Sequence, residues 1–119
     1  MPKKSNFVPS KIFKGEAKCY ITGRTSNLDK HHVLHGRGIR PLAEEDGLWI
    51  WLSHDLHMDI HDKGYAEVSD PLTGTYRKVT DKELQALGQQ IFIAEKMKEG
   101  YPEDVARDLF RSRYGRFYD

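Results

Sequence analysis

The pattern of apolar and polar positions predicts short strands in the first half of the chain and helices in the second half. A continuous apolar run at residues 48–52 (Leu-Trp-Ile-Trp-Leu) follows an acidic turn and predicts a buried strand. Residues 18–22 and 30–35 are predicted as two further strands, with turn-forming residues between them. The segment 36–41 that follows, with two glycines and two arginines, is predicted as a loop.

The apolar strand is followed by a predicted helix and then by a predicted hairpin. Ser53 is a suitable N-cap for a helix that ends at Lys63 and Gly64. Alternating residues near 65–69 and 75–79 flank the turn sequence Asp-Pro-Leu-Thr-Gly and predict a two-stranded hairpin.

Two helices are predicted in the C-terminal third. Thr80 and Glu83 have capping-box spacing, and the helix that they begin runs to about Glu99. A second helix begins at Pro102. The residues expected to face the core are Leu84, Leu87, Gly88, Ile91, Phe92 and Ala94 in the first of these helices, and Val105, Ala106, Leu109 and Phe110 in the second. The aromatic side chains of Tyr114, Phe117 and Tyr118 are expected either to tether the tail to the core or, with its arginines, to grip phosphates.

These elements predict the α+β class, with a small strand–strand–helix core at about 28–63, an added hairpin and two C-terminal helices. The length of 119 residues predicts one domain over 17–119, preceded by a basic arm at 1–16. Residues 1–40 hold nine Lys or Arg against two Asp or Glu, whereas residues 41–75 hold one against eight. A basic front half is suited to a polyanion, although a solvated charged surface is the simpler interpretation.

Composition excludes several classes of protein. A single cysteine, Cys19, excludes an intrachain disulfide and fits a reducing compartment. No apolar run approaches the roughly 18 residues that span a bilayer. We therefore expect a soluble protein of the cell interior, with no membrane partner.

All six histidines of the chain lie within one short window, at positions 31, 32, 35, 54, 57 and 61. His57 and His61 are four residues apart on the predicted helix, so that both can bind one ion. His31 and His32 are adjacent on a strand and point to opposite faces. One of this pair can supply a third metal ligand, and the other can act as general base on a water molecule. The pattern predicts a catalytic site for a divalent metal.

These motifs resemble the HNH nucleases with the ββα-metal (His-Me) finger. The likeness rests on the His pair, on the 25-residue step from His32 to His57, and on the His-x-x-x-His sequence that ends at His61. The resemblance implies that His31, His57 and His61 hold the metal, and that His32 activates water.

The likeness extends to phage-encoded HNH proteins related to RecA-dependent recombination-enhancement nucleases, over roughly residues 19–118. The segments that carry it are C-Y-I-T, H-H-V-L-H-G-R-G-I-R, G-L-W-I-W-L-S, L-Q-A-L-G-Q-Q-I-F and F-R-S-R-Y-G-R-F-Y. It implies an endonuclease that hydrolyses DNA phosphodiester bonds, encoded by a phage or mobile element, with a role in DNA recombination or processing. A recombinase or other partner protein and the cytoplasm of a bacterial host are further expectations.

Mg²⁺ or Mn²⁺ is expected to support the activity, while three imidazoles also suit Zn²⁺ or Ni²⁺. Arg37 and Arg40 are the expected phosphate ligands. His54 and His35 are further candidates for contacting the metal or supporting its ligands. The carboxylates of Asp55, Asp59 and Asp62 are expected to be solvated on the helix surface.

The chain departs from the family pattern at two places. Where many relatives carry a four-cysteine zinc site, this chain has Cys19, Thr22, Ser53 and Leu56. We therefore expect no structural zinc, and instead apolar packing around Trp49, Trp51 and Ile21. Leu48 lies near the place of the family asparagine that braces the catalytic loop. Either another group supports the base, or activity is reduced.

Two other functions stay open at the level of sequence. The lost asparagine and cysteines fit a degenerate finger that binds nucleic acid or protein without cutting. A histidine-rich metal site can also serve folding alone. The oligomeric state and the preferred DNA structure are not specified by these motifs.

Overall fold

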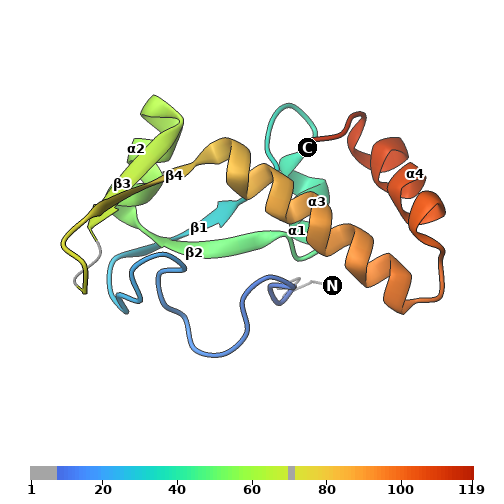
Figure 1. Ribbon diagram of the computed structural model, residues 1–119. Helices are drawn as coiled ribbons and strands as arrows, with labels where there is room; N and C mark the ends of the chain where they lie inside the picture. The colour runs from blue at the N-terminus through green and yellow to red at the C-terminus, as the bar shows by residue number, and fades with distance from the viewer. Residues whose placement is uncertain (1–7, 70–71) are drawn as a thin grey trace, which may run out of the picture.

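The computed structural model describes residues 8–69 and 72–119, and within them the chain forms four helices and two antiparallel two-stranded sheets (Figure 1). In chain order the elements are β1 (Leu28–His32), α1 (Arg40–Glu45), β2 (Trp49–Ser53), α2 (His54–Lys63), β3 (Tyr65–Ser69), β4 (Tyr76–Thr80), α3 (Asp81–Lys98) and α4 (Glu103–Tyr114). This composition confirms the α+β class.

β1, β2 and α2 form a strand–strand–helix unit. The two strands pair antiparallel, with His31 opposite Ile50. β1 ends at His32, three residues earlier than predicted, and begins at Leu28, two residues earlier. It ends there because its partner strand begins only at Trp49; beyond that pair a single backbone bond, from the Val33 N–H to the Leu48 carbonyl, continues the contact.

The prediction of a strand at residues 18–22 is wrong. These residues form a turn in which the Gly23 N–H donates to the Cys19 carbonyl, and Gly23 has a φ of 79°. A single backbone bond, from the Tyr20 N–H to the Trp51 carbonyl, joins this turn to β2. The turn-forming residues that follow Cys19 reverse the chain before it can pair with β2 as a strand.

Helix α1 was not predicted, because six residues are too few to show a helical period. Residues 36–39 form the expected loop, but Arg40 and Pro41 already belong to α1. Ala43 is the buried residue of this helix. Its backbone carbonyl accepts a hydrogen bond from the Leu48 N–H, which joins α1 to the start of β2.

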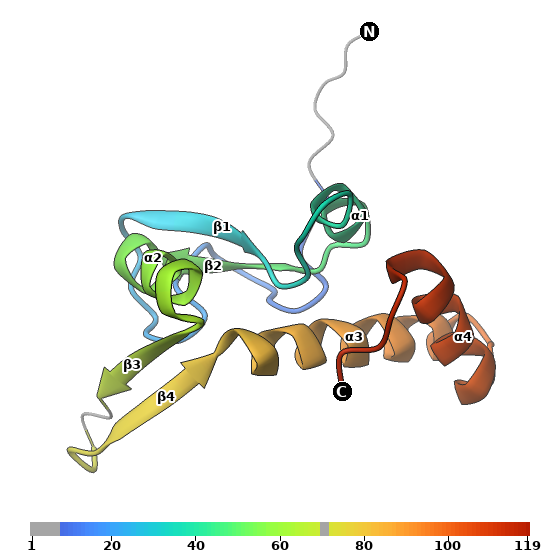
Figure 2. The same cartoon turned by 90° about the horizontal axis from the view of Figure 1, so that it is seen from above.

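The predicted hairpin is confirmed as β3 and β4, which pair antiparallel from Tyr65 opposite Thr80 to Ser69 opposite Tyr76. Residues 70–71 of its predicted turn lie outside the described residues. Figure 2 shows that the hairpin extends away from the strand–strand–helix unit and leads directly into the long helix α3. The Thr80–Glu83 capping box at that junction is confirmed.

The core-facing sides of α3 and α4 differ from prediction at four positions. Ala94 and Val105 are exposed, whereas Gln89 and Ile93 of α3 are buried. Gln89 is buried because its side-chain oxygen accepts a hydrogen bond from the Tyr118 N–H at 2.6 Å. The tail therefore packs across α3 and covers position 89, so that this position belongs to the buried face of the helix.

The C-terminal aromatic residues tether the tail to the core. Phe110 is fully buried and its ring stacks on that of Tyr114, with centroids 4.8 Å apart. The rings of Phe117 and Tyr118 lie 6.5 and 6.0 Å from that of Phe110. The tail thus belongs to the packed body of the protein.

The N-terminal segment also lies against the body in its described part. The Trp49 indole N–H donates to the Val8 carbonyl at 2.8 Å, and the buried Ser10 hydroxyl donates to the Trp49 carbonyl. Residues 1–7 of the predicted basic arm lie outside the described residues. Among the described helices, none combines the length and apolarity needed to cross a membrane.

Candidate metal centre

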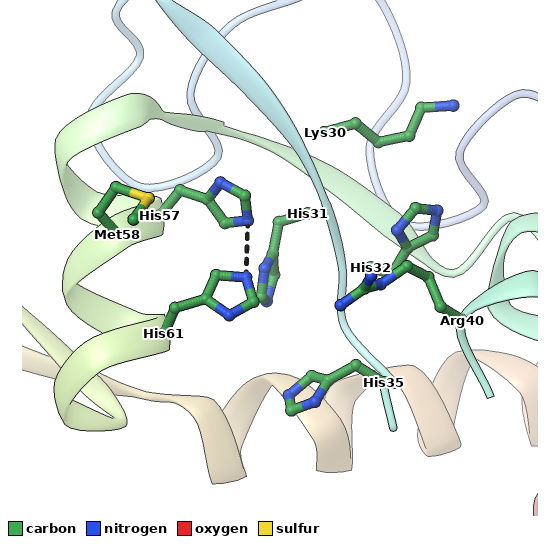
Figure 3. Close-up of a pocket in the computed structure, with 8 residues that line it drawn as sticks. All are labelled: Lys30, His31, His32, His35, Arg40, His57, Met58 and His61. Carbon is green, nitrogen blue, oxygen red and sulfur yellow. Dashed lines mark hydrogen bonds between the residues drawn. The ribbon is translucent and has the colours of Figure 1, made fainter. Parts of the chain in front are cut away.

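Three histidines from β1 and α2 converge on one point. The side chains of His31, His57 and His61 each offer a ring nitrogen, and these nitrogens lie within 4.8 Å of one another. Figure 3 shows the three rings facing one another in the space between the strand and the helix. This is the set of metal ligands that the resemblance to HNH nucleases implies.

Local structure explains this convergence. The β1–β2 register turns His31 toward α2, where it is only 2% exposed. His57 and His61 are four residues apart on α2, so that they lie one above the other on the same face. Their Nε2 atoms are 3.0 Å apart. Two imidazole nitrogens on one tetrahedral Zn²⁺ are about 3.3 Å apart, because each Zn–N bond is about 2.0–2.1 Å.

The electrostatic state of the His31 and His61 rings suits a cation. The Nε2 atom of His31 is buried and has no hydrogen-bond partner within residues 8–69 and 72–119. Burial, followed by the neighbouring His57 ring, lowers the pKa of His31 to about 3. Burial and the His57 ring also lower the pKa of His61. Neutral imidazoles with free lone pairs are the form that binds metal, so the residues present fit a divalent ion.

Asp29 supports this centre from β1. Its Oδ2 atom accepts hydrogen bonds from the Nδ1 atoms of His57 at 2.9 Å and of His54 at 2.7 Å. The bonds from His57 and His54 lower the pKa of Asp29, which keeps the carboxylate ionised. A carboxylate on Nδ1 directs the Nε2 lone pair of His57 toward the metal position. His54 is therefore placed beside the supporting carboxylate and outside the group of three.

His35 is close to the three rings but is held by another carboxylate. Its ring centroid is 6.3 Å from those of His31 and His61. Its Nε2 atom contacts the Asp81 carboxylate at 2.9 and 3.0 Å, and this hydrogen bond raises the pKa of His35. Asp81 is the first residue of α3, so the C-terminal half of the chain contributes to the site.

His32 lies on the opposite side of β1 from His31 (Figure 3), as alternation along the strand predicts. Both histidines line a cavity of about 390 Å³, together with Lys30, His35, Arg40, His57, Met58 and His61. Arg40 thus reaches the site, whereas Arg37 is exposed on the loop and does not line the cavity. The Nε2 atom of His32 contacts Glu44 Oε1 at 2.7 Å.

The carboxylates of α2 contribute no ligand to the group of three. Asp55 pairs with Arg24 at 3.7 Å, and Asp59 pairs with Lys63 at 3.9 Å. Asp62 is exposed. Their surface positions agree with the expectation that solvation dominates there.

Of the four positions that match the zinc site of HNH nucleases, Cys19 and Ser53 lie side by side. Cys19 is buried, and its sulfur lies 3.8 Å from the Ser53 hydroxyl. The buried Leu56 belongs to the apolar core cluster, and the partly buried Ile21 packs against that cluster. The rings of Trp49 and Trp51 pack edge to face, with their centroids 5.1 Å apart. Leu48, near the position at which HNH nucleases carry an asparagine, is 1% exposed and its side chain is apolar.

Sequence reasoning missed the three carboxylates that hold histidines in place. Asp29 carried a weak signal, because it precedes His31 by two residues and so shares its face of the strand. Glu44 and Asp81 carried no signal, because they reach His32 and His35 from elements 12 and 46 residues further along the chain.

Comparison of the chain with protein-family models, with curated proteins and with solved structures finds no match.

Proposed function

We propose that this protein is a metal-dependent endonuclease that hydrolyses phosphodiester bonds in DNA. His31, His57 and His61 are the proposed metal ligands, and His32 is the proposed general base. The observation that carries the proposal is the convergence of three imidazoles around the unpartnered Nε2 of buried His31, in one open cavity with His32. Three protein ligands leave positions for water and substrate, which a catalytic metal requires and a structural one does not.

The proposed reaction begins when His32 removes a proton from a water molecule. The hydroxide attacks phosphorus in line, the bond to the 3′ oxygen breaks, and that oxygen takes a proton from solvent. The family resemblance implies that one product ends in a 3′ hydroxyl and the other begins with a 5′ phosphate. A bound Mg²⁺ or Mn²⁺ would supply charge stabilisation for the phosphate and the leaving oxygen, and Zn²⁺ or Ni²⁺ would also fit three imidazoles.

The arginines of the loop and of α1 supply the proposed contacts to DNA. Arg40 lines the cavity and pairs with an oxygen of the scissile phosphate or of its neighbour. Arg37, three residues earlier on the exposed loop, pairs with a flanking phosphate. Such contacts position the backbone without reading the base sequence, so we propose low sequence specificity.

The biological setting is proposed from the family resemblance alone. It is a phage or mobile-element nuclease that acts in the cytoplasm of a bacterial host during DNA recombination or processing. A recombinase is the proposed class of partner protein.

A cleavage assay tests the function. Supercoiled, linear, single-stranded and branched DNA are incubated with the protein and Mn²⁺ or Mg²⁺, with and without EDTA. We expect metal-dependent nicking, which His32→Ala reduces by about 10²–10⁴-fold, as loss of a general base does. Asp59→Ala, a change at a partly exposed position of α2, is the control and should cut at the wild-type rate.

Failure of this assay has two informative forms. DNA binding without cutting, unchanged in His32→Ala, would mean a binding module on the same fold. Nicking that persists at full rate in His31→Ala and His32→Ala would mean that the histidine cavity is not the active site.

A further inference from the structure

The carboxylate of Glu44 contacts two residues of β1 that line the cavity. Its Oε1 atom lies 2.7 Å from His32 Nε2. Lys30 Nζ donates to both carboxylate oxygens, at 3.2 and 3.0 Å. The side chain of His32 is 16% exposed and that of Glu44 is 30% exposed. The contact is therefore partly shielded from water, which strengthens an ionic hydrogen bond.

Helix α1, which carries Glu44, is anchored to the core and to α4. Ala43, its neighbour in α1, is fully buried. Asp46 caps the same helix and accepts hydrogen bonds from Arg113 Nε at 2.7 Å and from the Tyr114 hydroxyl at 2.5 Å. The C-terminal helix thus fixes α1, and α1 fixes the carboxylate against His32.

The hydrogen bond has a direct chemical consequence for the imidazole. A neutral histidine carries one ring N–H, and its other nitrogen holds the lone pair that can accept a proton. If Nε2–H donates to Glu44, the lone pair is on Nδ1, and the ring cannot rotate without breaking the bond. Glu44 thereby selects both the tautomer and the orientation of the ring.

We propose that Glu44 is the positioning residue of the active site, which holds the His32 ring with Nε2 protonated and Nδ1 free to accept a proton from water. This inference rests on the proposed nuclease function. It also names the group that takes over support of the base from the asparagine that this chain lacks, since Leu48 near that place has no polar atom in its side chain.

The kinetic test compares Glu44→Ala and Glu44→Gln with the matched control Glu45→Gln. Glutamine keeps an oxygen that can accept the Nε2–H bond, whereas alanine removes it. Glu45 is the next residue of α1, and its exposed side chain pairs with Arg113 instead. With saturating Mn²⁺ we expect Glu44→Ala to lower kcat about 10–100-fold, as loss of a group that orients an active-site ligand does. KM, metal affinity and the Tm should change little, and Glu44→Gln should restore most of kcat.

A second measurement does not depend on activity. The ¹⁵N chemical shifts of the His32 ring, in metal-free protein labelled at histidine and assigned with His32→Gln, report which nitrogen is protonated. We expect the Nε2–H form in the wild type and in Glu45→Gln, and a mixture of tautomers in Glu44→Ala.

These readouts separate the two proposals. If the wild type does not cut DNA, the nuclease proposal fails, while the ¹⁵N shifts still decide whether Glu44 fixes the ring. If the wild type cuts and Glu44→Ala keeps its kcat or its tautomer, Glu44 is only the ion-pair partner of Lys30 and the inference is wrong. A lower Tm with an unchanged kcat in the folded protein overturns it in the same way.

Discussion

At the scale of single residues, the histidines of the cavity differ in the group that contacts their ring nitrogens. Asp29 accepts from Nδ1 of His57, and Asp81 contacts Nε2 of His35. His31 differs, because its buried Nε2 has no partner in the part of the chain that is described. A buried polar atom without a partner is costly, and a bound cation would remove that cost.

The role of Asp29 is testable by metal binding. We expect Asp29→Ala to weaken Zn²⁺ binding by about 10–100-fold, because His57 loses the carboxylate that orients it. Isothermal titration calorimetry on the purified variants measures this effect. Asp59→Ala removes a carboxylate from the outer surface of α2 and serves as control. Equal affinities of Asp29→Ala and wild type would show that His57 does not need this support.

The lowered pKa of His31 predicts how stability depends on pH. In the unfolded chain the pKa is about 6.5, whereas in the folded protein it is about 3. Between these values the unfolded chain binds a proton that the folded state does not, so stability is lost as the pH falls from 6.5 toward 3. From pH 7 to pH 5 this loss is about 2 kcal/mol for His31.

Urea unfolding in EDTA at pH 7 and pH 5, on the wild type and on His31→Leu, measures this contribution. Both proteins retain His35, whose raised pKa acts with the opposite sign, and His61, whose lowered pKa acts with the same sign. We expect the wild type to lose about 2 kcal/mol more than His31→Leu between the two pH values. Parallel losses in both proteins would contradict the buried, neutral state of His31.

At the scale of elements, the site depends on how closely α3 approaches the end of β1. Gly88 of α3 lies where a Cβ atom would be 2.6 Å from Val33 Cγ2 and 3.3 Å from Leu34 Cγ. Val33 and Leu34 are fully buried and directly follow the His31–His32 pair. A glycine inside a helix costs about 1 kcal/mol relative to alanine, and here the close approach explains its presence.

Gly88→Ala should therefore destabilise the protein despite the better helix propensity of alanine. We expect a net loss of about 1–2 kcal/mol, because the stiff, buried Val33 side chain must move to admit the methyl group. Chemical denaturation measures the change, and Gln90→Ala at an exposed position of the same helix should be nearly neutral. A more stable Gly88→Ala protein would mean that α3 does not pack so closely on this segment.

At the scale of the whole molecule, one apolar core joins the strand–strand–helix unit to the C-terminal helices. The core cluster extends from Cys19 through β2 and α3 to Phe110 and Tyr114 of α4. The ion pair of Asp46 with Arg113 joins α1 to α4 across the chain. A core of this extent does not require a metal ion to form, unlike that of small metal-dependent domains.

We accordingly expect the protein to stay folded in EDTA and to gain stability when metal is added. Zn²⁺ at 100 times its dissociation constant should add about 2.7 kcal/mol. Circular dichroism in EDTA followed by thermal melts with and without Zn²⁺ measures both effects. Loss of secondary structure on chelation would favour the alternative in which the metal serves folding.

The sequence alone determined the elements with a clear period or cap. The apolar run of β2, the His57–His61 spacing on α2 and the capping box of α3 depend on neighbours within one or two turns, so local chemistry specifies them. The opposite faces of His31 and His32 follow from strand geometry in the same way. These features predicted His57, His61 and one of the His31–His32 pair as ligands, and the choice of His31 came from the resemblance to HNH nucleases.

Only the tertiary structure decided what surrounds each histidine. Glu44 reaches His32 from a helix too short to leave a period in the sequence, and Asp81 reaches His35 from the start of α3. The exposure of Val105 and the burial of Gln89 likewise depend on where the tail crosses α3. Contacts between elements far apart in the chain are fixed by packing of the whole core, and no local pattern of residues encodes them.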